Sequence, residues 1–517
     1  MTPALPVGNA APAPTGSAAA EILRITNPAT GVLLAEVRAT TADDVAAALE
    51  RARRAHPAWA ARGPHARGQA LRQFARRLRD DPQLIDLISA ESGKPRFEAE
   101  AIELLYTCEL TRFLTGRKGQ RALADDRRRP FIFMHKVARV TYVPHGVVAV
   151  IGPWNWPLLN NYADCVPPLL AGNAVILKPS QVTPLSSLRV AQLWREAGLP
   201  ADVLQVLPGG ATVGAALVDS ADMVFFTGSV ATGRSIARRC GERLVPCVLE
   251  LGGKSPFVVL EDADVPAAAQ AAVWGCFANS GQVCVRPERV LVQEKIADAF
   301  EAECAQQMLG LRQGNDGGQG DANIDVGAMT FGPQVDHVED LIRDAVEQGA
   351  QVRVGGHRRE DMQGRFFAPT LLTGVTPQMR IVNEEIFGPV LPVVRFSGRD
   401  EAVALANAGG HGLSGSVWSA DKRGALAFAR RLATGAVCVN DVLVNYFCVE
   451  APIGGVKGSG LGFRHGPEAL RQFCRTETIV EGAPILGLLS GVITRQLGFP
   501  YKTRVLKLLR WFMRRFY

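Results

Sequence analysis

The stretch GVVAVIGPWNWPLLNNYADCVPPLLAGNAVILKPS, residues 146–180, decides the fold of this chain. It opens with an apolar, β-branched run, continues through a helix-like segment at 158–172 and closes with a second apolar run. Short apolar runs of this kind, separated by a helix, are typical of parallel strands buried on both faces. The stretch therefore predicts a strand, a helix and a second strand of one parallel sheet.

The same alternation continues beyond this stretch. Strands are expected at 203–209 and 223–229, with helices before and between them, and a second series of strands and helices runs from about 255 to 440. A helical pattern fills residues 42–125, with Thr41 as its candidate N-cap. The predicted fold class is α/β, with a Rossmann-type parallel-sheet domain and a second α/β domain. Ligands of such sheets bind at the carboxyl ends of the strands.

Composition argues against a nucleic-acid-binding, metal-binding or secreted protein. A chain of 517 residues is expected to form two or three domains, and its net charge of +7 is too small for this length to indicate a nucleic-acid partner. The ten cysteines are scattered, with no pattern of zinc spacing, so we expect no metal site and a reducing, cytoplasmic compartment. Residues 1–21 are rich in Ala, Pro and Gly and lack the apolar core of a secretory signal, which predicts a disordered leader.

Two residues stand out as candidates for chemistry. Cys284 lies in FANSGQVCVRPERV (277–290), and Glu250 lies in VPCVLELGGKSP (245–256). A thiol nucleophile and a carboxylate base, each near glycines that let the backbone approach a ligand, suit covalent catalysis on a carbonyl group. An isolated pair of this kind would more simply be a buried cysteine and a surface glutamate. The surrounding motifs reverse that expectation.

Seven motifs occur in one order along the chain: GPWNWPLLN (152–160), LKPSQVTP (177–184), FTGSVATG (226–233), LELGGKSP (249–256), NSGQVC (279–284), NEEIFGPV (383–390) and PIGGVKGSGLG (452–462). In this order and spacing they resemble the motifs of the aldehyde dehydrogenase superfamily, and the resemblance covers residues 22–480. It implies a cofactor domain at 22–128 and 146–252, a catalytic domain at 253–465 and an oligomerisation segment at 129–145 and 466–485.

The resemblance also implies a catalytic set. Cys284 would attack the aldehyde, and the Asn155 side-chain amide, with the Cys284 backbone N–H, would hold the oxyanion. Glu250 would activate the water that releases the product. The tunnel to Cys284 would be mainly apolar and aromatic, lined by Trp156, Asn160 and Phe447.

A nicotinamide cofactor, NAD or NADP, is implied by the same comparison. Lys178 would bind the adenosine ribose, Ser229 the pyrophosphate and Glu385 the nicotinamide ribose. The family most often has Glu where this chain has Gln181, and a neutral amide removes the repulsion of a 2′-phosphate, so NADP use becomes plausible. The full set of cofactor residues is Trp154, Lys178, Gln181, Gly228, Ser229, Gly233, Leu251, Glu385 and Phe387.

These residues predict oxidation of an apolar aliphatic or aromatic aldehyde to the carboxylic acid. Relatives that transfer the acyl group to coenzyme A, or that reduce acids, generally lack a carboxylate at the position of Glu250, so hydrolysis is favoured. A succinate-semialdehyde-type dehydrogenase, a coenzyme A-acylating or acid-reducing relative and a non-catalytic scaffold of the same fold stay open as alternatives.

Two exposed segments point to partners. The alternating apolar residues before 146 predict a hairpin outside both domains, which favours a homodimer or homotetramer. The tail at 486–517 is basic. On a helix, its apolar residues (Val505, Leu508, Leu509, Phe512, Phe516) share one face and its cations (Arg504, Lys507, Arg514) lie on another. Peripheral contact with an anionic membrane and packing on a neighbouring subunit are equally weighted interpretations.

Overall fold

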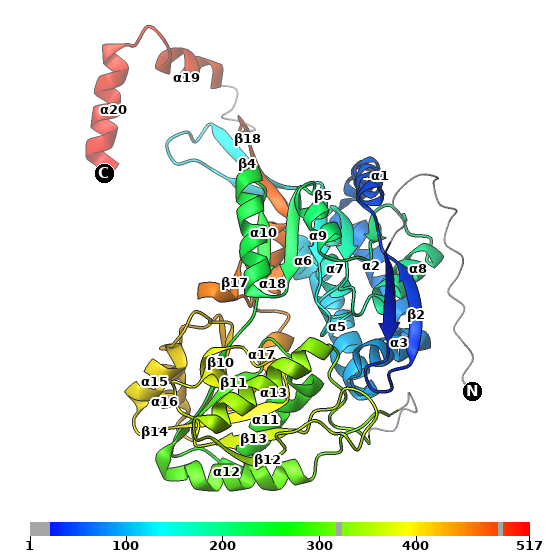
Figure 1. The fold of residues 1–517 in the computed structure, drawn as a ribbon. Coiled ribbons are helices and arrows are strands. Elements are labelled where there is room, and N and C mark those ends of the chain that lie inside the picture. The colour runs from blue at the N-terminus through cyan, green and yellow to red at the C-terminus, as the bar shows by residue number, and fades with distance from the viewer. Residues whose placement is uncertain (1–20, 317–322, 484–489, 517) are drawn as a thin grey trace.

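The computed structural model describes residues 21–316, 323–483 and 490–516. Its two large sheets lie in separate bodies, one above the other in Figure 1. Except for residue 21, the predicted leader lies outside the described residues.

The first body contains a six-stranded sheet in the order β17-β9-β8-β5-β6-β7. Neighbouring strands are parallel except β17 and β9. Residues 146–180 form β5, α7 and β6, as predicted, and both strands are buried along their whole length. The strand bounds are β5 Val147–Ile151, β6 Ala174–Lys178, β7 Leu204–Val206, β8 Met223–Thr227, β9 Cys247–Glu250 and β17 Gly460–Leu461.

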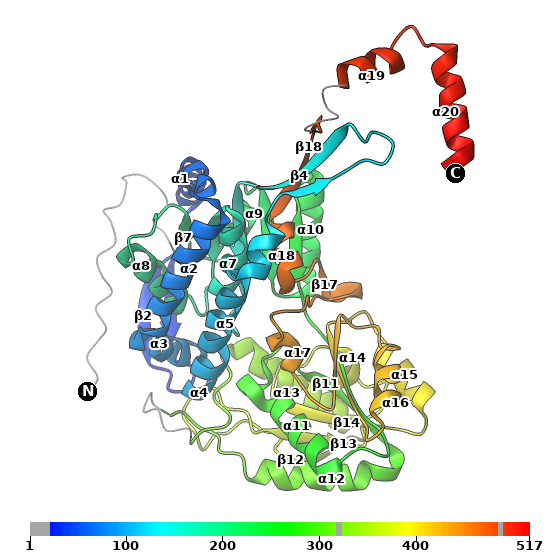
Figure 2. The same ribbon diagram turned by 180° about the vertical axis from the view of Figure 1, so that it is seen from behind.

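Helices surround this sheet in both views (Figures 1 and 2). Thr41 caps the first of them through a capping box with Asp44, which confirms the predicted N-cap. A two-stranded hairpin that sequence patterning did not indicate, β1 (Ile22–Thr26) with β2 (Leu33–Arg38), precedes α1. The helices of this body are α1 Ala42–Ala61, α2 Gly63–Arg79, α3 Pro82–Ser92, α4 Arg96–Glu98, the π-helix η1 Ala99–Leu104, α5 Leu105–Leu114, α6 Arg117–Ala122, α7 Tyr162–Ala171, α8 Leu185–Glu196, α9 Ala211–Val218, α10 Val230–Arg243 and α18 Gly466–Gln472.

The second body contains a seven-stranded sheet in the order β12-β13-β14-β11-β10-β15-β16, parallel except for β12 against β13. The second α/β series expected from the sequence is therefore present. Its strands are β10 Ser255–Val259, β11 Pro287–Gln293, β12 Gln351–Val354, β13 Thr370–Thr373, β14 Val390–Phe396, β15 Ser414–Trp418 and β16 Ala436–Val439. Its helices are α11 Val265–Phe277, the 3-10 turns η2 Ala278–Gly281 and η3 Lys457–Ser459, α12 Glu294–Leu309, α13 Gly332–Glu347, α14 Arg380–Asn383, α15 Arg399–Asn407, α16 Lys422–Ala429 and α17 Val444–Phe447.

A three-stranded antiparallel sheet projects from the first body, as Figure 2 shows. It consists of β3 (Asp126–Arg128), β4 (Lys136–Pro144) and β18 (Cys474–Gly482), and β18 pairs with β4 along all nine residues. The hairpin expected before residue 146 is thus completed by a strand more than three hundred residues later in the chain.

Three predicted boundaries differ from the structure. Strand β3 pairs with β4, so the projecting sheet begins before 129. Strand β17 pairs with β9 of the first sheet, although 253–465 was assigned to the second domain. Helix α18 packs against α6 and α7 of the first body rather than in the projecting sheet. For β17 and α18, contacts with segments distant in the chain, which local patterning does not report, decide where the segment belongs.

The C-terminal tail forms α19 (Ser490–Leu497) and α20 (Thr503–Phe516) beyond the projecting sheet (Figure 2). The predicted amphipathic helix is present, and no residue of α20 is buried. The Phe131 ring of the hairpin lies 6.0 Å from that of Phe512 and 5.7 Å from that of Phe516, between ring centroids. None of the described helices combines the length and apolar character needed to cross a membrane.

Candidate active site

A cavity of about 420 Å³ brings most of the predicted site residues together. Asn155 follows β5, Glu250 ends β9 and Cys284 precedes β11, so chain segments from both bodies meet here. This is the carboxyl edge of the first sheet, where ligands of such sheets bind. The cavity is lined by Pro153, Trp154, Asn155, Asn160, Thr227, Gly228, Ser229, Glu250, Leu251, Gly252, Cys284, Gln334, His337, Glu385 and Phe387.

The loop that carries Cys284 is held in an uncommon backbone conformation. Asn279 and Ser280 have φ angles of 50° and 54°, in the left-handed region that side chains other than glycine rarely adopt. Ser280 Oγ donates to the Gly327 carbonyl at 2.8 Å, and Gln282 Oε1 accepts from the Thr330 N–H at 2.9 Å. Such a conformation persists where the surrounding structure fixes it. The position of Cys284 is therefore set by contacts to distant segments.

Asn155 is buried and bonded on both its side chain and its backbone. Its Nδ2 donates to the Gln282 carbonyl at 2.8 Å, which leaves the second amide hydrogen for a ligand. Its own carbonyl accepts from Lys94 Nζ and from Asn279 Nδ2, both at 2.9 Å. The amide that was predicted to hold an oxyanion is thus fixed beside the Cys284 loop.

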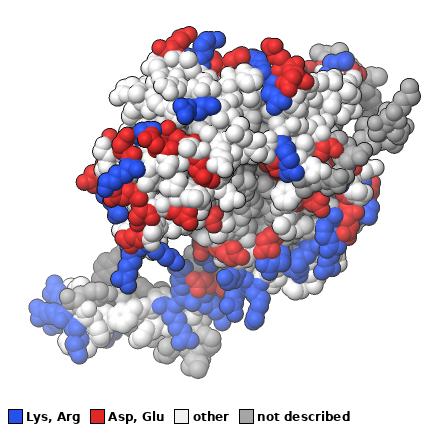
Figure 3. Space-filling model, turned by 90° about the horizontal axis from the view of Figure 1, so that it is seen from below, with Lys and Arg blue, Asp and Glu red and all other residues white. Residues whose placement is uncertain are grey.

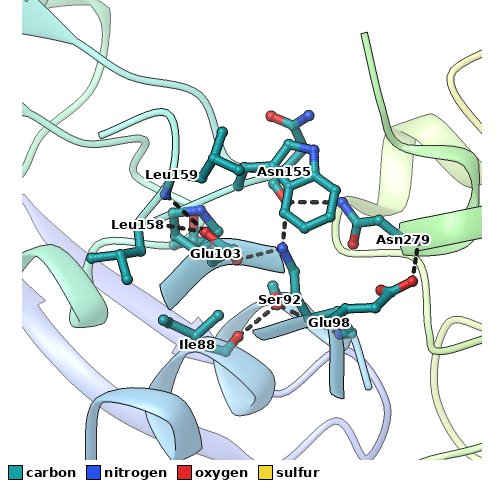
Figure 4. A network of polar contacts seen from close by, with 12 residues as sticks. Ile88, Ser92, Glu98, Glu103, Asn155, Leu158, Leu159 and Asn279 are labelled. Atoms are coloured by element: carbon teal, nitrogen blue, oxygen red, sulfur yellow. Dashed lines mark hydrogen bonds and ion pairs between the residues drawn. The ribbon is translucent and has the colours of Figure 1, made fainter. Parts of the chain in front are cut away.

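A buried ion pair supports this arrangement, and Figure 4 shows the network around it. Lys94 Nζ lies 2.5 Å from Glu103 Oε1, with both side chains fully buried. The other Glu103 oxygen accepts from the backbone N–H groups of Leu158 and Leu159, at 2.8 and 3.0 Å. Burial lowers the pKa of Lys94, and the charge of Glu103 opposes that shift.

A second carboxylate of the network reaches the nucleophile loop. Glu98 Oε1 accepts from the Asn279 backbone N–H at 2.8 Å. Burial raises the pKa of Glu98 to about 7. The acidic and basic side chains of α3 to η1 therefore link the loop that carries Asn155 to the loop that carries Cys284 (Figure 4).

Glu250 faces a buried arginine that the sequence had not indicated. Arg464 Nη1 lies 3.1 Å from Asp164 Oδ1, and its Nε lies 3.8 Å from Glu250 Oε1. These last two atoms have no hydrogen-bond partner among the described residues. Both side chains line a small cavity that also reaches Cys284. Burial raises the pKa of Glu250 to about 7, while the Arg464 charge opposes the shift.

Burial also shifts the pKa of the Cys284 thiol. It raises this pKa to about 12, while the positive charge of Arg464 opposes the shift. A thiol with so high a pKa is neutral near pH 7 and needs a proton acceptor before it attacks. Glu250 lines two cavities together with Cys284.

The cofactor side of the cavity has the features that a dinucleotide requires. Ser229 caps α10 by accepting from the Thr232 N–H at 3.3 Å, so the helix N-terminus faces the site. A Cβ on Gly228 would lie 2.5 Å from the Phe226 ring, and one on Gly233 would lie 2.4 Å from Leu251. Glycine is therefore needed at both positions for the chain to pack this closely.

The remaining predicted cofactor residues lie around the same cavity or beside it. Glu385 Oε1 accepts from the Gly253 N–H at 2.9 Å, and the Phe387 ring stands edge-on to Trp154 with centroids 5.5 Å apart. Lys178 Nζ donates to the carbonyls of Pro179 and Gly209, and burial lowers its pKa to about 8. Gln181 is exposed, close to Gly210. These residues fit a nicotinamide dinucleotide.

The substrate side is a narrow tunnel of about 30 Å³ that ends at Cys284. It contains the three residues predicted for it, Trp156, Asn160 and Phe447. No Lys, Arg or His lines it within the described part of the chain. Residues that sequence reasoning missed complete the wall: Ile102, Leu159, Trp274, Ala278, Val283, Val285, Leu443 and Tyr446.

Signals for some missed residues existed in the sequence. Tyr446 directly precedes the predicted tunnel residue Phe447, and Arg464 lies two residues after the last motif. Closeness in sequence to these features indicates both residues as candidates for the site. Lys94 and Glu103 are nine residues apart across α4 and η1, a spacing that does not indicate a helical pair. Arg286, which follows the nucleophile, donates to the carbonyls of Pro287, Gly388 and Val390 and so braces the loop.

Comparisons with known proteins agree with this geometry. A model of the aldehyde dehydrogenase family matches residues 15–479. A provisionally named succinate-semialdehyde dehydrogenase [NADP(+)] of Mycolicibacterium smegmatis is 37% identical over 487 residues, which is 93% of each chain. A 4,4′-diapolycopene aldehyde oxidase of a Methylomonas species is 39% identical over 432 residues, covering 82% of this chain and 79% of that one.

Solved structures give the same result. An E. coli NADP-dependent enzyme superposes with a TM-score of 0.85 at 34% identity, covering 90% of this chain and 95% of that one. A Mycobacterium tuberculosis aldehyde dehydrogenase complexed with NAD+ gives 0.84 at 33% identity, with 90% and 95% covered. The chain therefore belongs to the aldehyde dehydrogenase family and is an oxidoreductase that acts on aldehydes with NAD or NADP.

Proposed function

We propose that this enzyme oxidises an apolar aldehyde to the free carboxylic acid through a covalent intermediate on Cys284. The observation that carries the proposal is the meeting of Cys284, Glu250 and Asn155 at one cavity, with an apolar tunnel on its far side. The net reaction consumes the aldehyde, water and oxidised cofactor and yields the acid, reduced cofactor and a proton.

In the first step Cys284 attacks the aldehyde carbon. Glu250 takes the thiol proton, directly or through water, because the pKa of about 7 leaves part of its population ionised at neutral pH. The carbonyl oxygen becomes an oxyanion, which accepts from Asn155 Nδ2 and the Cys284 backbone N–H. Asn155 is supported in this role by its buried contacts to Lys94 and Asn279.

Ser229, Glu385 and Phe387 would hold a nicotinamide dinucleotide, which would supply the hydride acceptor that conversion of the adduct to a thioester on Cys284 requires. Once Glu250 has passed the thiol proton to solvent, it removes a proton from a water molecule that attacks the thioester carbon, and the Cys284 thiolate leaves. The small cavity shared by Glu250, Cys284 and Arg464 supports this placement of the water. The product is a carboxylate and the free thiol is restored on protonation.

The test is reduction of NAD and NADP by purified protein over a panel of short, long and aromatic aldehydes. We expect turnover with wild type and none with Cys284→Ala. A requirement for coenzyme A would favour the acyl-transferring alternative instead. Turnover by Cys284→Ala, or silence with every aldehyde and both cofactors, would contradict the proposal.

The tunnel wall favours an apolar substrate over a semialdehyde acid. A carboxylate buried without a cation or hydrogen-bond donors is strongly disfavoured, and no cationic side chain lines the described tunnel. Two buried cations close to the wall are already paired, Arg464 with Asp164 and Lys94 with Glu103. We expect kcat/KM for butanal to exceed that for succinate semialdehyde. The opposite order would overturn this part of the proposal.

NADP is proposed as a physiological cofactor. Gln181 is exposed and neutral where the family most often has a carboxylate, so a 2′-phosphate meets no repulsion there. The mycobacterial relative carries NADP(+) in its name, which agrees with this proposal. The ratio of kcat/KM for NADP to kcat/KM for NAD measures this cofactor preference.

Assembly and location are further parts of the proposal. A homodimer or homotetramer is supported by the projecting sheet, whose β18 has eight exposed residues. Cytoplasmic residence is supported by ten free cysteines. Peripheral membrane contact is supported by α20, with its exposed apolar residues and cations. Figure 3 shows Lys and Arg on the extension of the molecule that stands out from its main body. Sedimentation, with and without anionic vesicles, tests assembly and membrane contact separately.

A further inference from the structure

An apolar groove continues outward from the catalytic tunnel. The tunnel and the groove share four lining residues, Ile102, Trp274, Ala278 and Phe447, so the two spaces are contiguous. The groove has a volume of about 660 Å³, which lies in the range of pockets that hold small-molecule ligands. From this continuity, and on the basis of the proposed function, we infer that the groove binds the hydrocarbon chain of a long, unbranched aliphatic aldehyde.

The groove presents apolar side chains to solvent. Phe97 is 60% exposed and Trp274 is 46% exposed, although they belong to different helices, α4 and α11. Leu311 and Val273 also line it. Large aromatic side chains that stay exposed beside one another mark a surface that a ligand or partner covers.

Charge agrees with a hydrocarbon occupant. No Lys, Arg or His lines the groove among the described residues. Of its acidic side chains, Glu98 accepts from the Asn279 N–H and Asp325 is paired with Arg312. The described groove lining therefore offers no cation that would hold a terminal carboxylate, and burial of methylene groups is favourable there.

The relative sizes of the two spaces set the shape of the ligand. The tunnel measures about 30 Å³ and admits a slender chain, whereas the groove outside it is about twenty times larger. An aldehyde whose carbonyl carbon is at Cys284 therefore fills the tunnel with its first carbons and places the rest in the groove. Short aldehydes reach Cys284 without touching the groove at all.

The test measures kcat/KM for n-alkanals of increasing length with the full-length enzyme, at concentrations below those at which long alkanals aggregate. We expect an increase of about fourfold for each methylene group that enters the groove, the factor that burial of one CH2 group gives. A plateau once the tunnel is filled would overturn the inference.

Phe97→Ser distinguishes binding in the groove from the reaction at Cys284, because Phe97 lines the groove but not the tunnel. We expect kcat/KM for a long alkanal to fall about tenfold while that for propanal stays unchanged. Leu309→Ser, at an 80% exposed apolar residue outside the groove, is the matched control and should change neither value.

Equal loss for both substrates in Phe97→Ser would contradict the groove. If propanal is oxidised but chain length has no effect, the groove inference fails and the proposed function stands. If propanal and every longer alkanal are inert, the proposed function itself fails. An effect of Phe97→Ser on sedimentation alone would assign the surface to a second copy of this chain and overturn the inference.

Discussion

Cys284 lies between two spaces of opposite character. On the cofactor side, the wall carries Glu250, Glu385 and Asn155, and burial raises the pKa of both carboxyl groups to about 7. On the substrate side the wall is nearly all hydrocarbon. The contrast teaches that the proposed reaction divides between the two sides, with proton transfer and oxyanion binding assigned to the polar side and selection of the aldehyde to the apolar side.

Glu250→Gln removes the base of the polar side and should have the largest effect. We expect steady turnover to fall by about a hundredfold to ten thousandfold, since the neutral amide cannot accept a proton from water. Because Glu250 is the proposed base for both the attack and the release, a thioester on Cys284, followed in the mass of the intact protein, should build up only to the extent that its hydrolysis slows more than its formation. Glu250→Asp, which keeps the charge, serves as the control and should retain more activity.

Wild-type turnover should also rise as the pH passes through about 7, because Glu250 acts as a base only when it is deprotonated. A flat profile over this range, or unchanged turnover in Glu250→Gln, would remove Glu250 from the mechanism.

Lys94→Met tests whether the buried ion pair holds the polar side in place. Leaving Glu103 buried without its cation should cost about 3–5 kcal/mol of stability, measured as a fall in the unfolding temperature. Activity should fall as well, because Lys94 positions the Asn155 backbone.

The double variant Lys94→Met/Glu103→Gln is the matched control for this pair. It removes the uncompensated charge but keeps an acceptor for the Leu158 and Leu159 N–H groups, so it should recover part of the lost stability. Equal unfolding temperatures for wild type and Lys94→Met would show that the pair is dispensable.

Asn155→Ala removes one oxyanion donor from the polar side. We expect kcat to fall by about a hundredfold to a thousandfold, with a smaller change in KM, since the donor acts mainly in the transition state. Asn155→Asp, an acceptor of similar size, should be at least as impaired. A change confined to KM would place Asn155 in substrate binding instead.

Gln181→Glu lies at the outer end of the cofactor site and should have the smallest effect. The added charge repels the 2′-phosphate, so the ratio of kcat/KM for NADP over NAD should fall by about tenfold. Gln181→Ala controls for loss of the side chain and should shift the ratio less. An unchanged ratio would mean that other residues choose the cofactor.

The polar side was more predictable from sequence than the apolar side. Cys284, Glu250 and Asn155 sit in short motifs whose glycines and prolines mark loops at strand ends, and the parallel sheet that carries them has a local signal in residues 146–180. The tunnel and groove residues come from η1, α11 and α17, which are far apart in the chain. The sequence pattern of an apolar helix residue is the same whether the residue faces a core or a tunnel.

Long-range pairing explains the rest of what patterning missed. Arg464 meets Asp164 and Glu250 although they are 300 and 214 residues away in the chain, and β17 joins the first sheet although it follows the strands of the second in the sequence. Periodicity and capping report on neighbours in sequence, so such contacts leave no local trace.

The place of α20 in the chain, after β18 and α19, determines how many copies of this helix one assembly carries. Since β18 belongs to the projecting sheet, every copy that joins an assembly through this sheet brings its own α20 to the same complex. One amphipathic helix holds a surface weakly, whereas two on a single particle bind by avidity, often with a gain of about a hundredfold or more. Attachment to a surface would then rise steeply with enzyme concentration and follow the assembly equilibrium.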